Sequence, residues 1–184
     1  NRTLAMFHNR RRDGNFRAIK HVVEHGLIGD IFHAECTSYN WERPEVRWDA
    51  DKDVSGGRLY LWAPHAIDWV LQLVPSKVKC VTGFEHKPVW HHVTSEDHNR
   101  AIMHFENGAV AEVSDSRIAR IPKPLWYILG TKGAIWDGDD DSMAGYYFES
   151  VGHSEGSFRM VTERDGDVVD EQVPYAPSDW VQFY

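Results

Sequence analysis

The sequence predicts an α+β fold, built as a large, mainly antiparallel open sheet with helices packed on one of its faces. Helical apolar patterns are confined to the part of the chain before residue 75, and short β-branched and aromatic segments make up most of the rest. Two turn pairs, Asn107-Gly108 and Asp165-Gly166, separate such segments in the way that is typical of antiparallel hairpins. Because the helices come first and most strands follow, the order indicates an α+β domain.

The first helix is expected directly after Asp13, whose side chain is suited to cap it. Gly26 supplies a stop at its C-terminal end. Before this helix, the apolar residues 4–7 are expected to form a short strand or a buried entry segment. The helix presents one apolar face, formed by Phe16, Ile19, Val22 and Val23.

The next segments are a two-faced strand, a loop and a second helix. Residues 31–41 alternate in character and predict the strand, and the polar residues 42–56 predict the loop. Residues 58–74 carry a helical apolar stripe. Pro64 lies inside this stretch, so a kink or a break into two helices is expected there, and Pro75 ends it.

The remaining strands follow one another as a meander. No internal repeat and no internal domain boundary interrupts them, so residues 1–184 are expected to form a single domain. The strands are predicted at 78–84, 100–105, 109–114, 125–129, 134–136, 146–149, 158–162 and 168–169.

Composition excludes several classes of partner. The net charge is −8 and the one basic cluster is the run 10–12, which argues against nucleic-acid binding. No apolar run has the length of roughly 20 residues that a bilayer-spanning helix needs. Cys36 and Cys80 form no Cys-x-x-Cys pair, and both are expected to be reduced, buried thiols in a cytoplasmic protein.

The sequence contains no recognisable cofactor or metal motif. It lacks a Gly-x-Gly-x-x-Gly turn and a P-loop, so this chain alone offers no visible place for a dinucleotide. Eleven histidines invite a metal interpretation, with His91, His92 and His98 as the densest group. Their spacing matches no zinc site, so no metal is expected and a metal-dependent hydrolase is a distant third interpretation.

His65 is the strongest candidate for chemistry. It follows Pro64 on the polar side of the second helix, and Asp68 lies three residues later on the same helical face. A carboxylate beside an imidazole can fix the ring and tune it as a proton carrier. The alternative is a histidine that caps the helix or is satisfied in the core.

Several segments, in this order, resemble the C-terminal domain of the Gfo/Idh/MocA oxidoreductases, the family of glucose-fructose oxidoreductase and inositol dehydrogenase. The similarity runs from about residue 4 to residue 184. Its segments are Asn9-Arg10-Arg11 with Asp13-Gly14 and Phe16, Gly26 to Asp30, Tyr39 to Pro44, Gly56-Gly57 through Pro64-His65-Ala66-Ile67-Asp68 to Leu73, Asn107-Gly108-Ala109, and Gly130-Thr131-Lys132-Gly133.

This resemblance implies a two-part enzyme. A preceding Rossmann domain, absent from this sequence, holds NAD or NADP, and the domain seen here supplies the substrate face and a sheet through which a homodimer or tetramer forms. The implied reaction is hydride transfer between a nicotinamide and a secondary alcohol of a sugar or polyol. The end of the chain resembles the start of the family's last helix, with Ser178 as its cap, so that helix is expected to be incomplete and the chain alone to be inactive.

The resemblance also assigns candidate site residues. His65 matches the family's histidine, which is expected to act as acid/base or to orient substrate. The family's aspartate four residues earlier is replaced by Leu61, and Ala63 replaces a usual glycine. This departure keeps open a non-catalytic carbohydrate-binding or oligomerisation module with a degenerate site. The further substrate-binding candidates are Asn9, Arg11, Arg43, Trp62 and Asp68.

Overall fold

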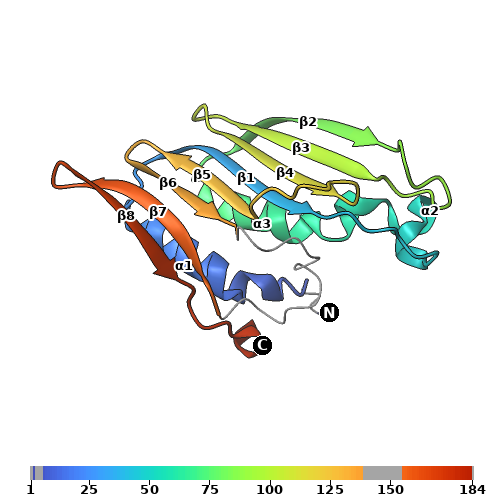
Figure 1. Ribbon diagram of the computed structural model, residues 1–184, viewed down its shortest axis with the longest axis horizontal. Coiled ribbons are helices and arrows are strands. Elements are labelled where there is room, and N and C mark those ends of the chain that lie inside the picture. Colours follow the sequence, from blue (N-terminus) through green and yellow to red (C-terminus); the bar gives the residue numbers. More distant parts are fainter. Residues whose placement is uncertain (1, 3–5, 139–154, 184) are drawn as a thin grey trace.

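The computed structural model describes residue 2, residues 6–138 and residues 155–183. The strands within these ranges form one eight-stranded sheet (Figure 1). The strand order is β2-β3-β4-β1-β5-β6-β7-β8. Neighbouring strands run antiparallel, except that β1 and β4 are parallel. The strands are β1 (Ile31–Tyr39), β2 (Val78–His86), β3 (His98–Phe105), β4 (Val110–Ser116), β5 (Trp126–Gly130), β6 (Gly133–Asp137), β7 (Ser157–Arg164) and β8 (Asp167–Pro174).

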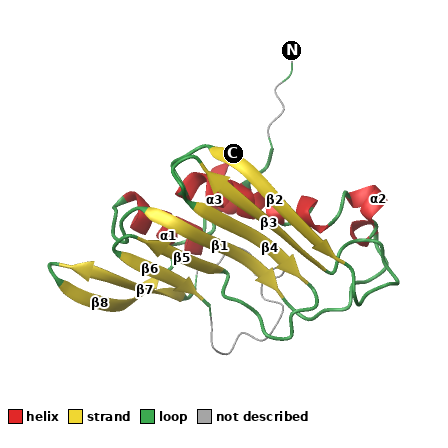
Figure 2. Cartoon of the chain, turned by 90° about the horizontal axis from the view of Figure 1, so that it is seen from above, coloured by secondary structure: helices red, strands yellow, loops and turns green. Residues whose placement is uncertain are grey.

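Two longer helices lie on one face of this sheet (Figures 1 and 2). They are α1 (Gly14–Glu24) and α3 (Ala63–Leu73). No helix of the described part covers the opposite face, which confirms the predicted α+β architecture. The short elements are α2 (Lys52–Ser55) and the 3-10 helices η1 (Asn9–Arg12), η2 (Trp48–Ala50), η3 (Arg58–Tyr60) and η4 (Trp180–Phe183).

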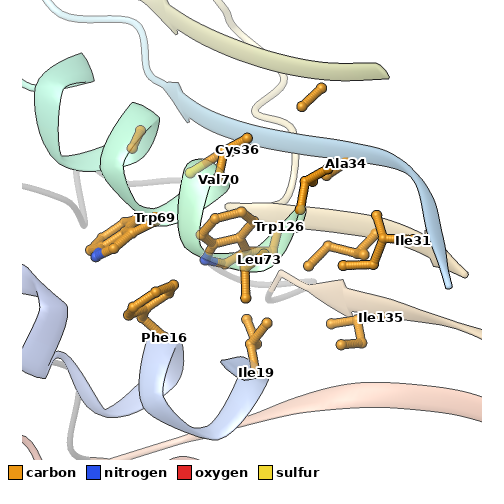
Figure 3. Packing of buried hydrophobic residues seen from close by; sticks show 14 of the residues in the cluster. Phe16, Ile19, Ile31, Ala34, Cys36, Trp69, Val70, Leu73, Trp126 and Ile135 are labelled. Carbon is orange, nitrogen blue, oxygen red and sulfur yellow. The ribbon is translucent and has the colours of Figure 1, made fainter. Parts of the chain in front are cut away.

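The core lies between the two helices and the sheet (Figure 3). Phe16 of α1 stacks on Trp69 of α3 with ring centroids 5.4 Å apart, and Trp69 lies 5.8 Å from Trp126 of β5. All three side chains are almost completely buried. Large aromatic rings remove much apolar surface from water, so this stack joins both helices to the sheet. It also holds α3, the helix that carries His65, against the sheet.

Both expected hairpins are present. Gly108 turns β3 into β4 with φ of 88°. Asp165 and Gly166 join β7 to β8 with φ of 56° and 88°, the left-handed pair that a tight hairpin turn requires. The break near Pro64 is also confirmed, since η3 ends at Tyr60 and α3 begins at Ala63 with the proline in its first turn.

Several local expectations are wrong. Residues 42–56 include the helical turns η2 and α2, and the side chain of Asp51 caps α2 by accepting the N–H of Asp53. Asp13 precedes α1 as expected, but its carboxylate makes no cap and is held by other side chains. Met6 and Phe7 are exposed and outside any strand, while residues 3–5 lie outside the described residues.

The two cysteines differ. Cys36 is completely buried in β1, as predicted, and burial raises the pKa of its thiol. Cys80 is exposed, as is nearly the whole of β2, which forms one edge of the sheet. The strand predicted at 146–149 lies outside the described residues. Among the helices that are described, none has the length and apolarity that crossing a bilayer requires.

Candidate active site

His65 lies in the first turn of α3 and is half-buried. Its ring meets the ring of His8 edge-to-face, with centroids 5.7 Å apart. In both rings the Nδ1 atom is buried, and it has no hydrogen-bond partner within the described part of the chain. The site therefore contains two imidazoles in contact, each with an unused ring nitrogen.

Asp68 is held by groups other than His65. Arg11 donates two hydrogen bonds to its carboxylate, 2.8 Å from Nε and 2.6 Å from Nη2, and Gln72 Nε2 donates a third at 3.0 Å. Burial opposes ionisation of Asp68, but the hydrogen bonds and charge of Arg11 outweigh it and hold the pKa of the carboxyl below its ordinary value. The expected fixing of the His65 ring by this carboxylate is not seen at Nδ1.

His65 is kept neutral by its surroundings. Burial is the main cause, and the charges of Arg10 and His8 add to it, so that the pKa of His65 falls to about 4 despite the opposing charge of Asp68. A neutral imidazole can accept a proton at one nitrogen and release one from the other. Near neutral pH this side chain is therefore unprotonated, with one ring nitrogen free to act as an acceptor.

The short helix η1, which carries Arg10 and Arg11, is fixed from two sides. Trp69 of α3 donates a hydrogen bond of 2.9 Å to the carbonyl oxygen of Arg10. The fully buried Asp13 accepts one from Trp180 Nε1 at 2.6 Å and one from the Arg10 guanidinium at 3.1 Å. The segment beside His65 thus depends on contacts from α3 and from the far end of the described chain.

The other candidate residues lie at different depths. Asn9 begins η1 and is half-buried. Trp62, just before α3, is only 4% exposed and packs edge-to-face on Trp69 within the core. Arg43 is exposed in the loop after β1, and no ion pair of the described residues links it to His65 or Asp68. The cluster is therefore formed by His65, Asp68, Arg11 and the unpredicted His8, and the binding roles of Asn9, Arg43 and Trp62 stay predictions.

A buried ion pair anchors the chain just before α3. Arg58 donates two hydrogen bonds to Asp115 of β4, at 2.7 and 2.8 Å, and both side chains are almost completely buried. The backbone N–H of Arg58 donates to Glu96 at 2.9 Å. Gly57 has φ of 98°, and a Cβ there would meet the Glu96 carboxylate at 2.7 Å. Sequence reasoning noted the Gly56-Gly57 pair but missed Arg58, because its partner is 57 residues away.

The described residues present no metal-binding group of three or more His, Cys, Asp or Glu side chains. His91 and His92 are exposed in a turn, while His98 lies on β3 beside His86 of β2, at 5.6 Å between ring centroids. The described residues also contain no dinucleotide-binding motif, because none of their parallel strands leads through a Gly-rich turn into a helix.

Comparison with known proteins identifies the family. Residues 16–136 match the family model described as the GFO/IDH/MocA C-terminal domain. The chain belongs to this family. Within it, the segment from α1 to β6 is the matched part, and it contains Arg58, His65 and Asp68.

Individual relatives carry oxidoreductase names. The Escherichia coli protein "Uncharacterized oxidoreductase YdgJ" is 29% identical over 120 residues, covering 60% of this chain and 34% of its own length. The Bacillus subtilis "scyllo-inositol 2-dehydrogenase (NADP(+)) IolW" is 40% identical over 72 residues, covering 38% of this chain and 20% of its own. The matched part of this chain thus spans between 20% and 34% of the length of these curated relatives.

Solved structures agree on the fold. A Bacillus cereus oxidoreductase superposes with a TM-score of 0.77 at 24% identity, over 97% of this chain and 54% of that one. The chain therefore has the architecture of about half of such a protein. The family resemblance inferred from the residues is confirmed, whereas the roles of single site residues stay predictions.

Proposed function

We propose that this chain is the substrate-binding domain of an NAD(P)-dependent oxidoreductase that acts on a secondary alcohol of a sugar or polyol. The observation that carries the proposal is His65, a neutral imidazole with an unused nitrogen at the start of α3, inside the family match. The name of the relative IolW, an NADP(+)-dependent scyllo-inositol dehydrogenase, supports a polyol and a nicotinamide.

In this proposal His65 takes the proton of the substrate hydroxyl. Its low pKa keeps the imidazole unprotonated and able to accept that proton at neutral pH. Arg11 and Asp68 neutralise each other across two hydrogen bonds, so the pair lies beside His65 without adding net charge to the site. A site without a strong unpaired charge suits a neutral polyol better than a carboxylate or phosphate.

The dinucleotide is proposed to be held by a neighbouring domain. The described residues contain no Gly-rich turn that leads from a parallel strand into a helix, so we assign no residue of this chain to hold the dinucleotide. When bound, the nicotinamide would accept the hydride from the carbinol carbon. The proposed role of this chain is to bind the alcohol and to remove the proton of its hydroxyl group.

The proposal is tested by measuring dinucleotide binding and substrate oxidation separately. Calorimetry of this chain alone with NADP(H) and NAD(H) is expected to show no saturable binding. The intact protein that carries the chain is expected to reduce a nicotinamide dinucleotide with at least one member of a panel of inositols and sugars. Tight dinucleotide binding by the chain alone, or an intact protein that is inactive on the whole panel, would contradict it.

We also propose that the face of the sheet opposite the helices pairs subunits into a homodimer or tetramer. That face carries apolar side chains, among them Ile102, Tyr127 and Leu129, beside the Arg100–Glu112 ion pair. A broad face that mixes apolar residues with paired charges suits a second copy of the same chain.

The alternative function is a module that binds carbohydrate without catalysis. The exposed side chains of Trp41 and Trp48 favour it, and in such a module His65 would be dispensable.

A further inference from the structure

We infer that His8 is the proton-relay partner of His65, receiving the proton that His65 takes from the substrate hydroxyl and passing it to solvent. This inference rests on the proposed function and deepens it. It assigns a role to a residue outside both the expected site and the matched range 16–136.

The two rings are placed to exchange a proton. Their centroids are 5.7 Å apart at an interplanar angle of 87°. Each ring has a buried Nδ1 atom without a hydrogen-bond partner among the described residues. A buried polar nitrogen left unpaired costs free energy, and the two Nδ1 atoms are not hydrogen-bonded to each other, so a proton would pass between the rings through one bridging water.

The other charged groups around His65 are already engaged by partners of their own. Arg10 is a donor only, and its guanidinium is bound to Asp13 and lies 5.7 Å from the Trp180 ring centroid. The Asp68 carboxylate already accepts three hydrogen bonds, from Arg11 and Gln72. Among the titratable and charged groups that face His65, His8 is the one whose ring nitrogen has no hydrogen-bond partner among the described residues.

His8 is also held in place. Its carbonyl oxygen accepts the N–H of Arg11 at 3.2 Å, which joins it to η1. η1 is in turn fixed to α3 by the Trp69 hydrogen bond and by the Arg11–Asp68 pair. The backbone that carries His8 is therefore tied to the helix that carries His65, and the ring contact is part of that arrangement.

The proton balance is complete. The hydroxyl O–H bond breaks and a His65 nitrogen gains the proton, while the other His65 nitrogen passes one to His8. His8 releases a proton to water, so both rings return to the neutral form. The two electrons of the carbinol C–H bond leave as hydride to an oxidised nicotinamide dinucleotide, which the proposed function supplies.

The first test does not need activity. In this chain, labelled with ¹⁵N in the imidazoles, the titrations of His8 and His65 are followed by NMR in the wild type, in His8→Gln and in His65→Gln. Because the His8 charge lowers the His65 pKa, His8→Gln is expected to raise it. His25→Gln, at the exposed C-terminal end of α1, is the control and should leave the His65 pKa unchanged. A His65 pKa that is the same in His8→Gln as in the wild type overturns the relay.

The second test uses the intact protein and a substrate found in the panel. His8→Ala is expected to lower kcat by about 10²-fold, with little change in KM, and added imidazole is expected to restore part of the loss. His8→Ala with wild-type kcat and an unchanged pH profile, beside an inactive His65→Gln, overturns the relay but leaves the proposed function in place. If the wild type is inactive on every substrate, the proposed function fails, and the NMR coupling alone decides whether the two rings share a proton.

Discussion

Arg58 and Asp115 form an ion pair that is almost completely withdrawn from water, with 5% and 3% of their side chains exposed. Taking both charges out of water is costly, and the two hydrogen bonds between them compensate for that cost only while both partners are present. The pair ties the residues before α3 to the end of β4. It therefore supports the position from which His65 is presented.

Replacing only Arg58 should be strongly destabilising. Arg58→Met leaves Asp115 buried without its partner, and we expect the free energy of unfolding to fall by about 3–5 kcal/mol. Urea denaturation measures this. Arg159→Met, which breaks an ion pair with the exposed Asp170, is the control and should be close to neutral. Equal losses of unfolding free energy in Arg58→Met and Arg159→Met would show that the burial of the Arg58–Asp115 pair does not determine its contribution to stability.

The neutral His65 should make stability depend on pH. Its pKa is about 4 in the folded chain against an ordinary value of 6.5, so between these pH values the unfolded chain binds the proton and the folded chain does not. This contribution to stability is complete above about pH 6.5 and is lost as the pH falls toward about 4. His65→Gln should therefore lose less stability than the wild type between about pH 7 and about pH 4.5. An identical loss in both proteins would contradict the lowered pKa.

At the scale of elements, the C-terminal segment closes the start of α1. The Ser178 hydroxyl accepts the N–H of Gly14 at 2.8 Å, the N–H of Ala176 donates to the Gly14 carbonyl oxygen, and Trp180 binds Asp13. The cap of α1 thus comes from a residue 164 positions away, while the adjacent Asp13 is occupied elsewhere. Such a contact links both ends of the described chain next to the candidate site.

Removing the Ser178 hydroxyl should therefore weaken α1. We expect Ser178→Ala to lower the free energy of unfolding by about 1 kcal/mol, the usual cost of losing a helix cap. Thermal and urea denaturation test this. Ser157→Ala is the matched control, because Ser157 makes one exposed hydrogen bond, to Gln172. A Ser178→Ala variant as stable as this control would show that the contact does not cap the helix.

At the scale of the whole molecule, the uncovered face of the sheet should control assembly. Ile102→Glu places a charge among the apolar side chains of that face, and we expect it to shift a dimer or tetramer toward monomers in sedimentation experiments. Ile121→Glu, in an exposed loop, should leave assembly unchanged. A wild type that is monomeric at high concentration would contradict the pairing of sheets.

Patterns along the sequence predict the features of the fold that depend on neighbouring residues. The α1 face, the break at Pro64 and the two Gly-containing hairpins follow from spacing and turn residues, and the α+β class follows from their order. Contacts between distant residues could not be predicted in this way. Arg58 with Asp115, Ser178 with Gly14 and His8 with His65 become neighbours only after the sheet has formed.

The site shows the same division. The sequence indicates His65 and Asp68, because a proline precedes the histidine and the aspartate follows it at helical spacing, whereas His8 has no such neighbours. The pairing of Asp68 with Arg11 depends on η1 folding back onto α3. The exposure of Cys80 likewise depends on β2 being an edge strand, which alternation along a single strand does not reveal.

The most direct test of the account is the turnover of the intact protein with an active polyol and a nicotinamide dinucleotide, compared between the wild type, His65→Gln and the control His25→Gln. We expect His65→Gln to lower kcat by at least about 10²-fold with the fold intact, and His25→Gln to behave as the wild type. Wild-type turnover by His65→Gln would contradict the assignment of the proton to His65 and would favour a module that binds without catalysing.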